Sequence, residues 1–300
     1  MNASDRLKGI ATFVAVAQAG SFTAAAERLN LSNSAVGKSV ARLEGRLGAR
    51  LFERSTRQLA LSEAGEAYLA VCTRVLDDLE SAETTLAAQH IEPAGTLRLD
   101  LPASFGRLRV LPLILQLSAR YPKMLPHLSF TDRFVDILDE GIDLAVRIGG
   151  PAPGGAGLAH RYLGVEQLIF CASPDYLLRH GTPATGEDLQ QHARIQYGKA
   201  DGGVSPWLFA APQPAAWATP PRLVVGNAEA QAAAVAAGYG VAQLSTWLIR
   251  QQLESGELVP ILPHLAIDGL PLHLVWPTRR APLPKLKVLI EHLAAQLTVD

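Results

Sequence analysis

The most restrictive feature of this sequence is a regularly spaced apolar stripe within its first fifty residues. The residues recur at spacings of four, three and four, which places them on one face of a helix. They are Val36, Val40, Leu43 and Leu47. Ser32 is placed to cap this helix, after a tight turn at residues 30–31, and Ser21 to cap a shorter helix over residues 23–29. Two helices joined by so short a turn form a helix-turn-helix.

The face opposite the stripe carries small or basic side chains, which would let the helix enter a DNA major groove. The candidate DNA-binding residues of this helix and its first turn are Ser32, Asn33, Ser34, Gly37, Lys38 and Arg42. An arginine-rich turn between apolar pairs then predicts a β-wing suited to phosphate contacts, which Arg50, Arg54 and Arg57 would make. A solvated outer face and loose surface arginines are the alternatives.

A long helix is expected over residues 63–89, with one narrow apolar stripe. Its members follow spacings of 4, 3, 4, 3 and 4, which is a heptad pattern. They are Tyr68, Cys72, Val75, Leu79, Ala82 and Leu86. The stripe predicts a dimer seam, and a dimer would hold two recognition helices at a fixed spacing. Packing against its own domain is the alternative.

Charge is unevenly distributed along the chain. The net charge of the 300 residues is −1, yet residues 1–65 hold nine Lys and Arg against five Asp and Glu. The basic part therefore coincides with the helix-turn-helix. No secretory signal or membrane span is evident. The chain has two cysteines, Cys72 and Cys171, which is typical of a protein in a reducing cytoplasm, and both are expected to be buried as small hydrophobic residues.

The remaining two hundred residues alternate strands with helices, which predicts βαβ units and a largely parallel sheet. Strands are expected at residues 96–102, 127–132, 142–149, 166–173, 193–198, 222–227 and 240–245. Helices are expected at residues 104–121, 134–141, 174–181, 228–238 and 284–297. Residues 259–265 and 271–277 suggest that the chain crosses back to its first lobe. The predicted domains are 1–62, 63–90 and 91–300, with lobe I at about 95–162 and 268–300 and lobe II at about 163–267.

Residues 21–69, SFTAAAERLNLSNSAVGKSVARLEGRLGARLFERSTRQLALSEAGEAYL, resemble the winged helix-turn-helix of the LysR-type transcriptional regulators. The resemblance implies an all-α winged helix-turn-helix, a linker helix and a two-lobed α/β effector domain similar to periplasmic binding proteins. It implies a homotetramer that binds promoter DNA and a small effector such as a carboxylate, and it makes RNA polymerase a further candidate partner. Gly37 departs from the family, which usually has a hydroxyl residue there.

Ligands of open α/β sheets bind beyond the carboxyl ends of the strands. Ser104, Thr131 and Asn227 hold such positions, and a hydroxyl or amide there is suited to a carboxylate or phosphate. The resemblance implies that Ser104 and Thr131 contact the effector, with Arg147 as a charge partner. Helix capping is the alternative for Ser104 and Asn227, and a surface or interlobe role is the alternative for Arg147.

Catalytic machinery is not evident in the sequence. We find no nucleophile with a positioned base, no phosphate loop and no His or Cys spacing typical of a metal site, so no cofactor is expected. A ligand-responsive DNA-binding regulator is therefore favoured. The competing class is a solute-binding or enzymatic α/β protein with an incidental helical N-terminus, and the salt dependence of duplex binding would separate the two.

Overall fold

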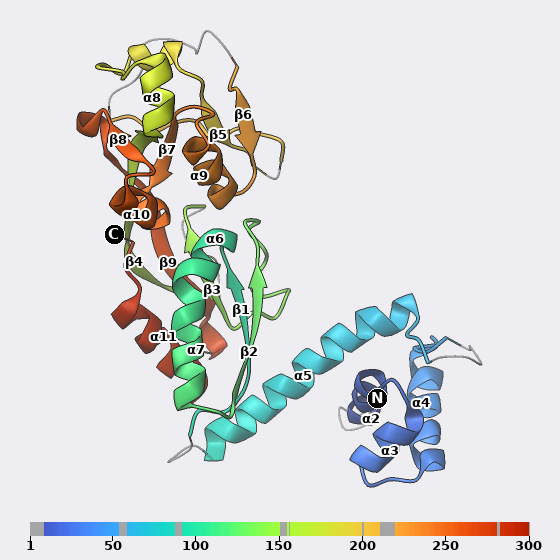
Figure 1. The fold of residues 1–300 in the computed structure, drawn as a ribbon. Coiled ribbons are helices and arrows are strands. Elements are labelled where there is room, and N and C mark those ends of the chain that lie inside the picture. The colour runs from blue at the N-terminus through green and yellow to red at the C-terminus, as the bar shows by residue number, and fades with distance from the viewer. Residues whose placement is uncertain are drawn as a thin grey trace. The chain divides into compact units, whose positions relative to one another are not determined.

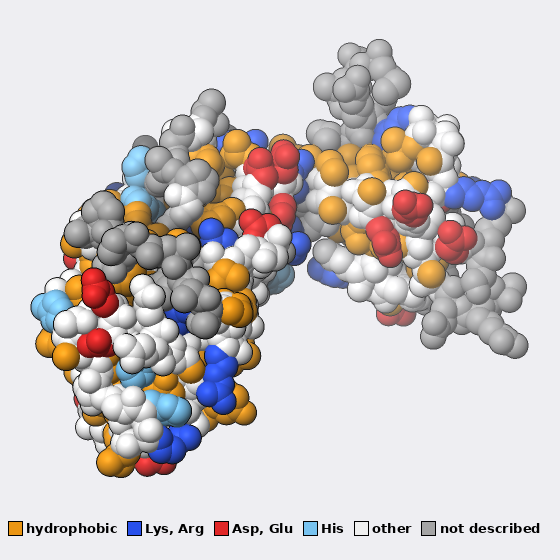
Figure 2. All heavy atoms as spheres, turned by 90° about the horizontal axis from the view of Figure 1, so that it is seen from above, with side chains coloured by type: hydrophobic (Ala, Val, Ile, Leu, Met, Phe, Trp, Pro, Cys, Tyr) orange, Lys and Arg blue, Asp and Glu red, His pale blue; other side chains and the backbone are white. Residues whose placement is uncertain are grey.

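A computed structural model describes residues 9–53, 59–87, 92–150, 155, 157–199, 201–210, 220–280 and 283–299. The chain divides into two compact units, residues 1–91 and residues 92–300. Over the face of the larger unit seen in Figure 2, acidic and basic side chains are scattered among uncharged ones.

The first unit is helical. Its helices are α2 (Ile10–Ala19), α3 (Phe22–Arg28), α4 (Asn33–Leu47) and α5 (Glu63–Ala87). The predicted caps are confirmed, since the Ser21 and Ser32 hydroxyls accept from the backbone N–H of Ala24 and Ala35. Asn30 adopts φ 52° in the turn between α3 and α4. The apolar stripe of α4 is buried through Val36, Val40 and Leu43, and Leu47 is 39% exposed at the end of the helix.

The second unit begins with lobe I, which contains a three-stranded parallel set covered by helices (Figure 1). Its elements are β1 (Gly95–Leu101), α6 (Ala103–Phe105), the π-helical turn η1 (Gly106–Val110), α7 (Leu111–Arg120), β2 (Met124–Phe130), β3 (Leu144–Ile148) and α11 (Pro284–Gln296). Leucines of β1 pack with apolar residues of α7 and α11 in one core. The helix predicted at residues 134–141 is wrong, because the chain forms turns there. The Asp136 carboxylate accepts from the backbone N–H of Leu138 and Asp139, which favours a turn over a helix.

Lobe II has cores of its own, which lie against β4 and β7. Its elements are α8 (Pro174–His180), η2 (Asp188–Gln191), β5 (Ile195–Tyr197), β6 (Leu223–Val225), α9 (Ala228–Ala236), β7 (Ala242–Ser245), α10 (Thr246–Ser255), β8 (Val259–Ile261) and η3 (Pro263–Leu265). The helix α10 is absent from the predictions. Both cysteines are buried and free, as expected.

Two long strands run through both lobes (Figure 1). They are β4 (Leu158–Ala172) and β9 (Ile267–Pro277), which leads into η4 (Thr278–Arg280). They pair antiparallel with each other, and β9 pairs antiparallel with β3. The resulting sheet has seven strands, with the order β2-β1-β3-β9-β4-β7 and β8 paired to β4. The prediction of a largely parallel sheet is therefore wrong. The sheet is mixed, because the chain enters and leaves lobe II along neighbouring strands.

Candidate nucleic-acid interface and effector cleft

The outer face of α4 is polar and accessible. The side chains of Ser32, Asn33, Ser34, Lys38 and Arg42 are exposed. Local bonds fix the start of this face, since the Asn33 amide donates to the Thr23 hydroxyl at 2.9 Å. At Gly37 an added Cβ would meet no atom within 4 Å, so packing inside this unit does not require glycine there. The missing side chain instead leaves free space on the candidate DNA-facing surface.

The segment after α4 is tied back to the helix by one carboxylate. Glu44 accepts from the backbone N–H of Leu51 at 2.7 Å and of Phe52 at 3.3 Å. Phe52 forms an antiparallel bridge with Leu61, at the base of the predicted wing. Arg50 is exposed beside this base. Arg54 and Arg57 lie outside the described residues.

The first half of the predicted dimer seam lies against its own domain. Cys72 is 1% exposed and belongs to the same core as Phe13 and Leu43, and the Tyr68 ring lies 5.7 Å from that of Phe13. Cys72 is therefore too buried to contact a partner helix, so it does not belong to the predicted dimer seam. Farther along α5, Val75 is half-buried and Leu79 is 42% exposed. The seam stays a prediction there, and the side chains of Ala82 and Leu86 lie outside the described residues.

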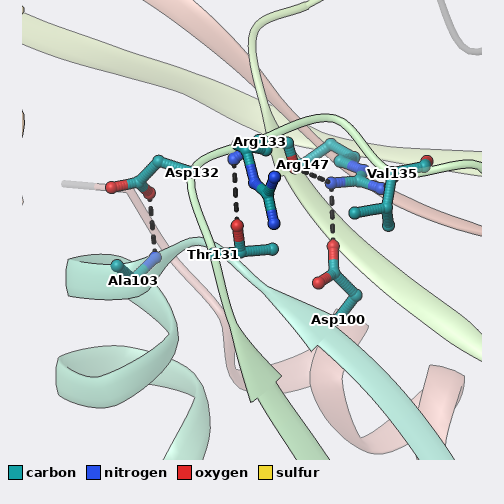
Figure 3. A network of polar contacts seen from close by, with 7 residues as sticks. All are labelled: Asp100, Ala103, Thr131, Asp132, Arg133, Val135 and Arg147. Atoms are coloured by element: carbon teal, nitrogen blue, oxygen red, sulfur yellow. Dashed lines mark hydrogen bonds and ion pairs between the residues drawn. The ribbon is translucent and has the colours of Figure 1, made fainter. Parts of the chain in front are cut away.

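In the second unit, Ser104 and Thr131 follow neighbouring parallel strands. Ser104 is 4% exposed, and its hydroxyl has no hydrogen-bond partner among the residues that the structure describes. Thr131 is more accessible, and its hydroxyl accepts from the backbone N–H of Arg133 at 3.2 Å (Figure 3). A buried hydroxyl without a partner carries an energetic cost that a bound ligand can remove.

Arg147 is engaged by the protein itself. It forms an ion pair with Asp100 at 2.8 Å and donates to the backbone carbonyls of Arg133 and Val135 (Figure 3). Burial raises the pKa of Asp100 to about 6, although the Arg147 guanidinium acts in the opposite direction. The arrangement fits a structural tie under the loop that follows β2, within lobe I, and differs from the surface or interlobe role that was the alternative for Arg147.

Asn227 acts as a helix cap. Its side-chain oxygen accepts from the backbone N–H of Ala230 at 2.9 Å, at the start of α9. Two residues later, Glu229 forms an ion pair with Arg107 of lobe I. Capping is thus sufficient to explain Asn227, and the start of α9 is joined to the other lobe.

A further polar residue near the contact between the lobes was not predicted from the sequence. The Thr246 hydroxyl is buried at the start of α10 and, like that of Ser104, has no partner among the described residues. The neighbours of these two residues, Phe105 and Trp247, meet edge to face across the lobes, with ring centroids 5.0 Å apart. Ligands bind beyond the carboxyl ends of strands, and this rule points to Ser104 after β1. It also points to Thr246 after β7, but only when the helix α10 is known to follow that strand.

A carboxylate also joins the lobes. Asp132 accepts from the backbone N–H of Ala103 at 2.9 Å and from the Tyr197 hydroxyl of β5 at 3.1 Å. Tyr197 is half-buried, and burial together with the Asp132 charge raises its pKa to about 12. Its partner lies 65 positions away in the chain, so no local pattern could have revealed the contact.

Comparison with known proteins assigns both units. Residues 7–66 match the model for the bacterial regulatory helix-turn-helix protein, lysR family, and residues 90–298 match the LysR substrate binding domain. This chain belongs to the LysR family of transcriptional regulators. A LysR-type regulator combines a helix-turn-helix DNA-binding domain with an effector-binding domain, and the two units have these roles.

The relatives of this LysR-type regulator cover nearly all of it. It is 32% identical to the HTH-type transcriptional regulator CrgA of Neisseria meningitidis, over 96% of each chain. It is 30% identical to the transcriptional activator AaeR of Escherichia coli, over 96% of this chain and 93% of that one. The solved structure of CrgA superimposes with a TM-score of 0.61 and covers 98% of each chain.

Two other features are absent from the part of this regulator that the structure describes. No helix there is both long and apolar enough to cross a bilayer. Within the same residues, no three His, Cys, Asp or Glu side chains are grouped so that they could hold a metal ion.

Proposed function

We propose that this protein binds promoter DNA through the exposed face of α4, with phosphate contacts from Arg50, Arg54 and Arg57, and that an effector in the interlobe cleft controls it. The observation that carries the DNA-binding proposal is the polar face of α4, where Lys38 and Arg42 are exposed opposite a buried apolar stripe. Such a helix can enter a major groove without uncovering its core. Since promoter DNA is the partner, the protein acts in the cytoplasm.

The protein works as a dimer or a tetramer in this proposal. One recognition helix reads too few base pairs for useful affinity, whereas two at a fixed spacing can read an interrupted palindrome. The second half of α5 supports the pairing, because the predicted seam residue Leu79 is 42% exposed there. RNA polymerase is a further partner that bound promoter DNA would bring close.

Salt-dependent binding tests the DNA proposal. We expect the full-length protein to prefer a duplex from its own promoter region over random duplex, with an affinity that falls steeply as salt rises, by a log–log slope of about −0.9 for each phosphate contact. Fluorescence anisotropy measures both quantities. A protein that stays monomeric at micromolar concentration and shows no preference would contradict the proposal.

The effector proposal places a small carboxylate between the lobes. The buried hydroxyls of Ser104 and Thr246, which lack partners among the described residues, support a ligand that accepts hydrogen bonds. Thermal-shift measurements on the full-length protein against a panel of metabolic acids and their amides test this, because a ligand that binds only the folded state raises the melting temperature. Stabilisation by amides alone would exclude an acidic effector.

A further inference from the structure

Two carboxylates near the carboxyl ends of β1 and β2 are held in opposite ways. Asp100 is 1% exposed and faces the Arg147 guanidinium. Asp132 is exposed, its two oxygens accept from Ala103 N–H and the Tyr197 hydroxyl, and it forms no ion pair with a described Lys, Arg or His. Releasing Asp100 would leave a buried cation unpaired, whereas releasing Asp132 returns an exposed carboxylate to water. Asp132 is therefore the exchangeable one.

The donors that hold Asp132 belong to different lobes. Ala103 lies in the first turn after β1 in lobe I, and Tyr197 lies at the end of β5 in lobe II. Figure 3 shows the Asp132 side chain directed at Ala103, near Thr131. The unpartnered, buried hydroxyl of Ser104 is next in sequence to Ala103. A carboxylate at this place thus bridges the lobes and has a further hydroxyl near it.

We propose that Asp132 is a built-in carboxylate that occupies the effector's place: it links the lobes through Ala103 and Tyr197 in the free protein, and an acidic effector replaces it on these donors. The inference rests on the proposed function, because it assumes an acidic effector between the lobes. It identifies the donors between the lobes that recognise the acid, and it makes the position of the Asp132 side chain the quantity that the acid changes.

The lobes stay in contact when Asp132 leaves. The Arg107–Glu229 ion pair and the Phe105–Trp247 ring contact also join them. Loss of Asp132 from its donors, with no acid in its place, therefore shifts one lobe against the other about these contacts and does not separate them. An acid bound to the same donors keeps the lobes linked while Asp132 is released.

Spin labels on the full-length protein test the proposal. Gln116→Cys on α7 and Leu178→Cys on α8 provide exposed sites in the two lobes, and the native cysteines are buried. In this labelled background we expect Asp132→Ala to move the interlobe distance to longer values and to speed the exchange of the Ala103 amide about tenfold, because one hydrogen bond is lost. Sodium acetate should restore both, whereas acetamide, of equal size and no charge, should not.

Two tyrosine variants complete the test. Tyr197→Phe removes only the hydroxyl, so we expect the same longer distance without rescue by acetate, and this variant decides the matter if Asp132→Ala fails to fold. Tyr162→Phe is the matched control, since Tyr162 is 56% exposed and its ring packs against His273, with the ring centroids 5.4 Å apart.

An unchanged interlobe distance in both Asp132→Ala and Tyr197→Phe overturns the proposal, as does acetate that restores neither quantity in Asp132→Ala. Both readouts are made without DNA or effector. A failure of promoter binding would therefore count against the proposed function and leave this result standing.

Discussion

The two units differ in how the polar groups of their candidate sites are hydrogen-bonded. In the DNA-binding unit, the residues of the candidate surface are exposed, and local bonds such as Ser32 to Ala35 N–H hold them. In the effector unit, Ser104 and Thr246 hold buried hydroxyls without a partner among the described residues, and the lobes meet through contacts distant in sequence. The first surface is preorganised for a rigid duplex. The second has hydrogen bonds left to form, which a small ligand can supply.

The largest effect is expected where the DNA-binding unit is packed most tightly. A Cβ at Gly65 would collide with the Leu51 carbonyl, whereas a Cβ at Gly45 would meet no atom within 4 Å. We expect Gly65→Ala to destabilise this unit by about 3 kcal/mol through overpacking. Gly45→Ala should stabilise it by about 0.5–1 kcal/mol through helix propensity. Calorimetry of the full chain measures both, and equal melting of the two variants would contradict the prediction.

The buried carboxylate Asp100 makes the effector unit sensitive to pH. Its pKa is raised from 3.8 to about 6 in the folded protein, so the folded state holds the proton more tightly than the unfolded chain. The stability that this provides is complete below pH 4 and is lost as the pH rises through 6, by about 3 kcal/mol in total. Denaturant titrations between pH 4 and pH 7 measure the change. Asp100→Asn should reduce the dependence of the free energy of unfolding on pH. If the variant shows the same dependence as the natural protein, Asp100 is not its cause.

The DNA-binding surface should respond to charge alone. Lys38→Gln on α4 removes one exposed cation, so we expect affinity for all duplexes to fall up to about tenfold and the salt slope to decrease by about 0.9. Lys287→Gln on α11 is the matched control, exposed in the effector unit. If the two variants bind alike, Lys38 does not contact phosphate. Arg54→Ala should act as Lys38→Gln does, if Arg54 contacts phosphate as we propose.

The smallest effect contrasts stability with ligand binding at Ser104. Ser104→Ala removes a buried hydroxyl without a described partner, so we expect the free effector unit to gain about 1 kcal/mol while its response to effector weakens. Ser118→Ala, farther along the same helical run, corrects for helix propensity. Thermal unfolding with and without the metabolite panel gives both quantities. A loss of stability would indicate that Ser104 has a structural role.

The sequence predicts best where the physics is local. The helix-turn-helix is determined by serine N-caps, by glycine residues that end helices and by one apolar stripe. All of these residues lie within a few helical turns of the residues that they position. The helix predicted at residues 134–141 fails because the Asp136 carboxylate competes for nearby backbone N–H groups. The interlobe contacts of Asp132 and Glu229 escape prediction because their partners lie 65 or more positions away in the chain.

The antiparallel pair β4 and β9 has a consequence for how this regulator can change over evolution. The chain leaves lobe I on β4 and returns on β9, so lobe II is an insertion whose entry and exit lie side by side. Both ends of the effector unit, β1 and α11, belong to lobe I and share one core. Lobe II can therefore be exchanged as a cassette between relatives, with new ligand chemistry, while the attachment to the DNA-binding unit stays as it is.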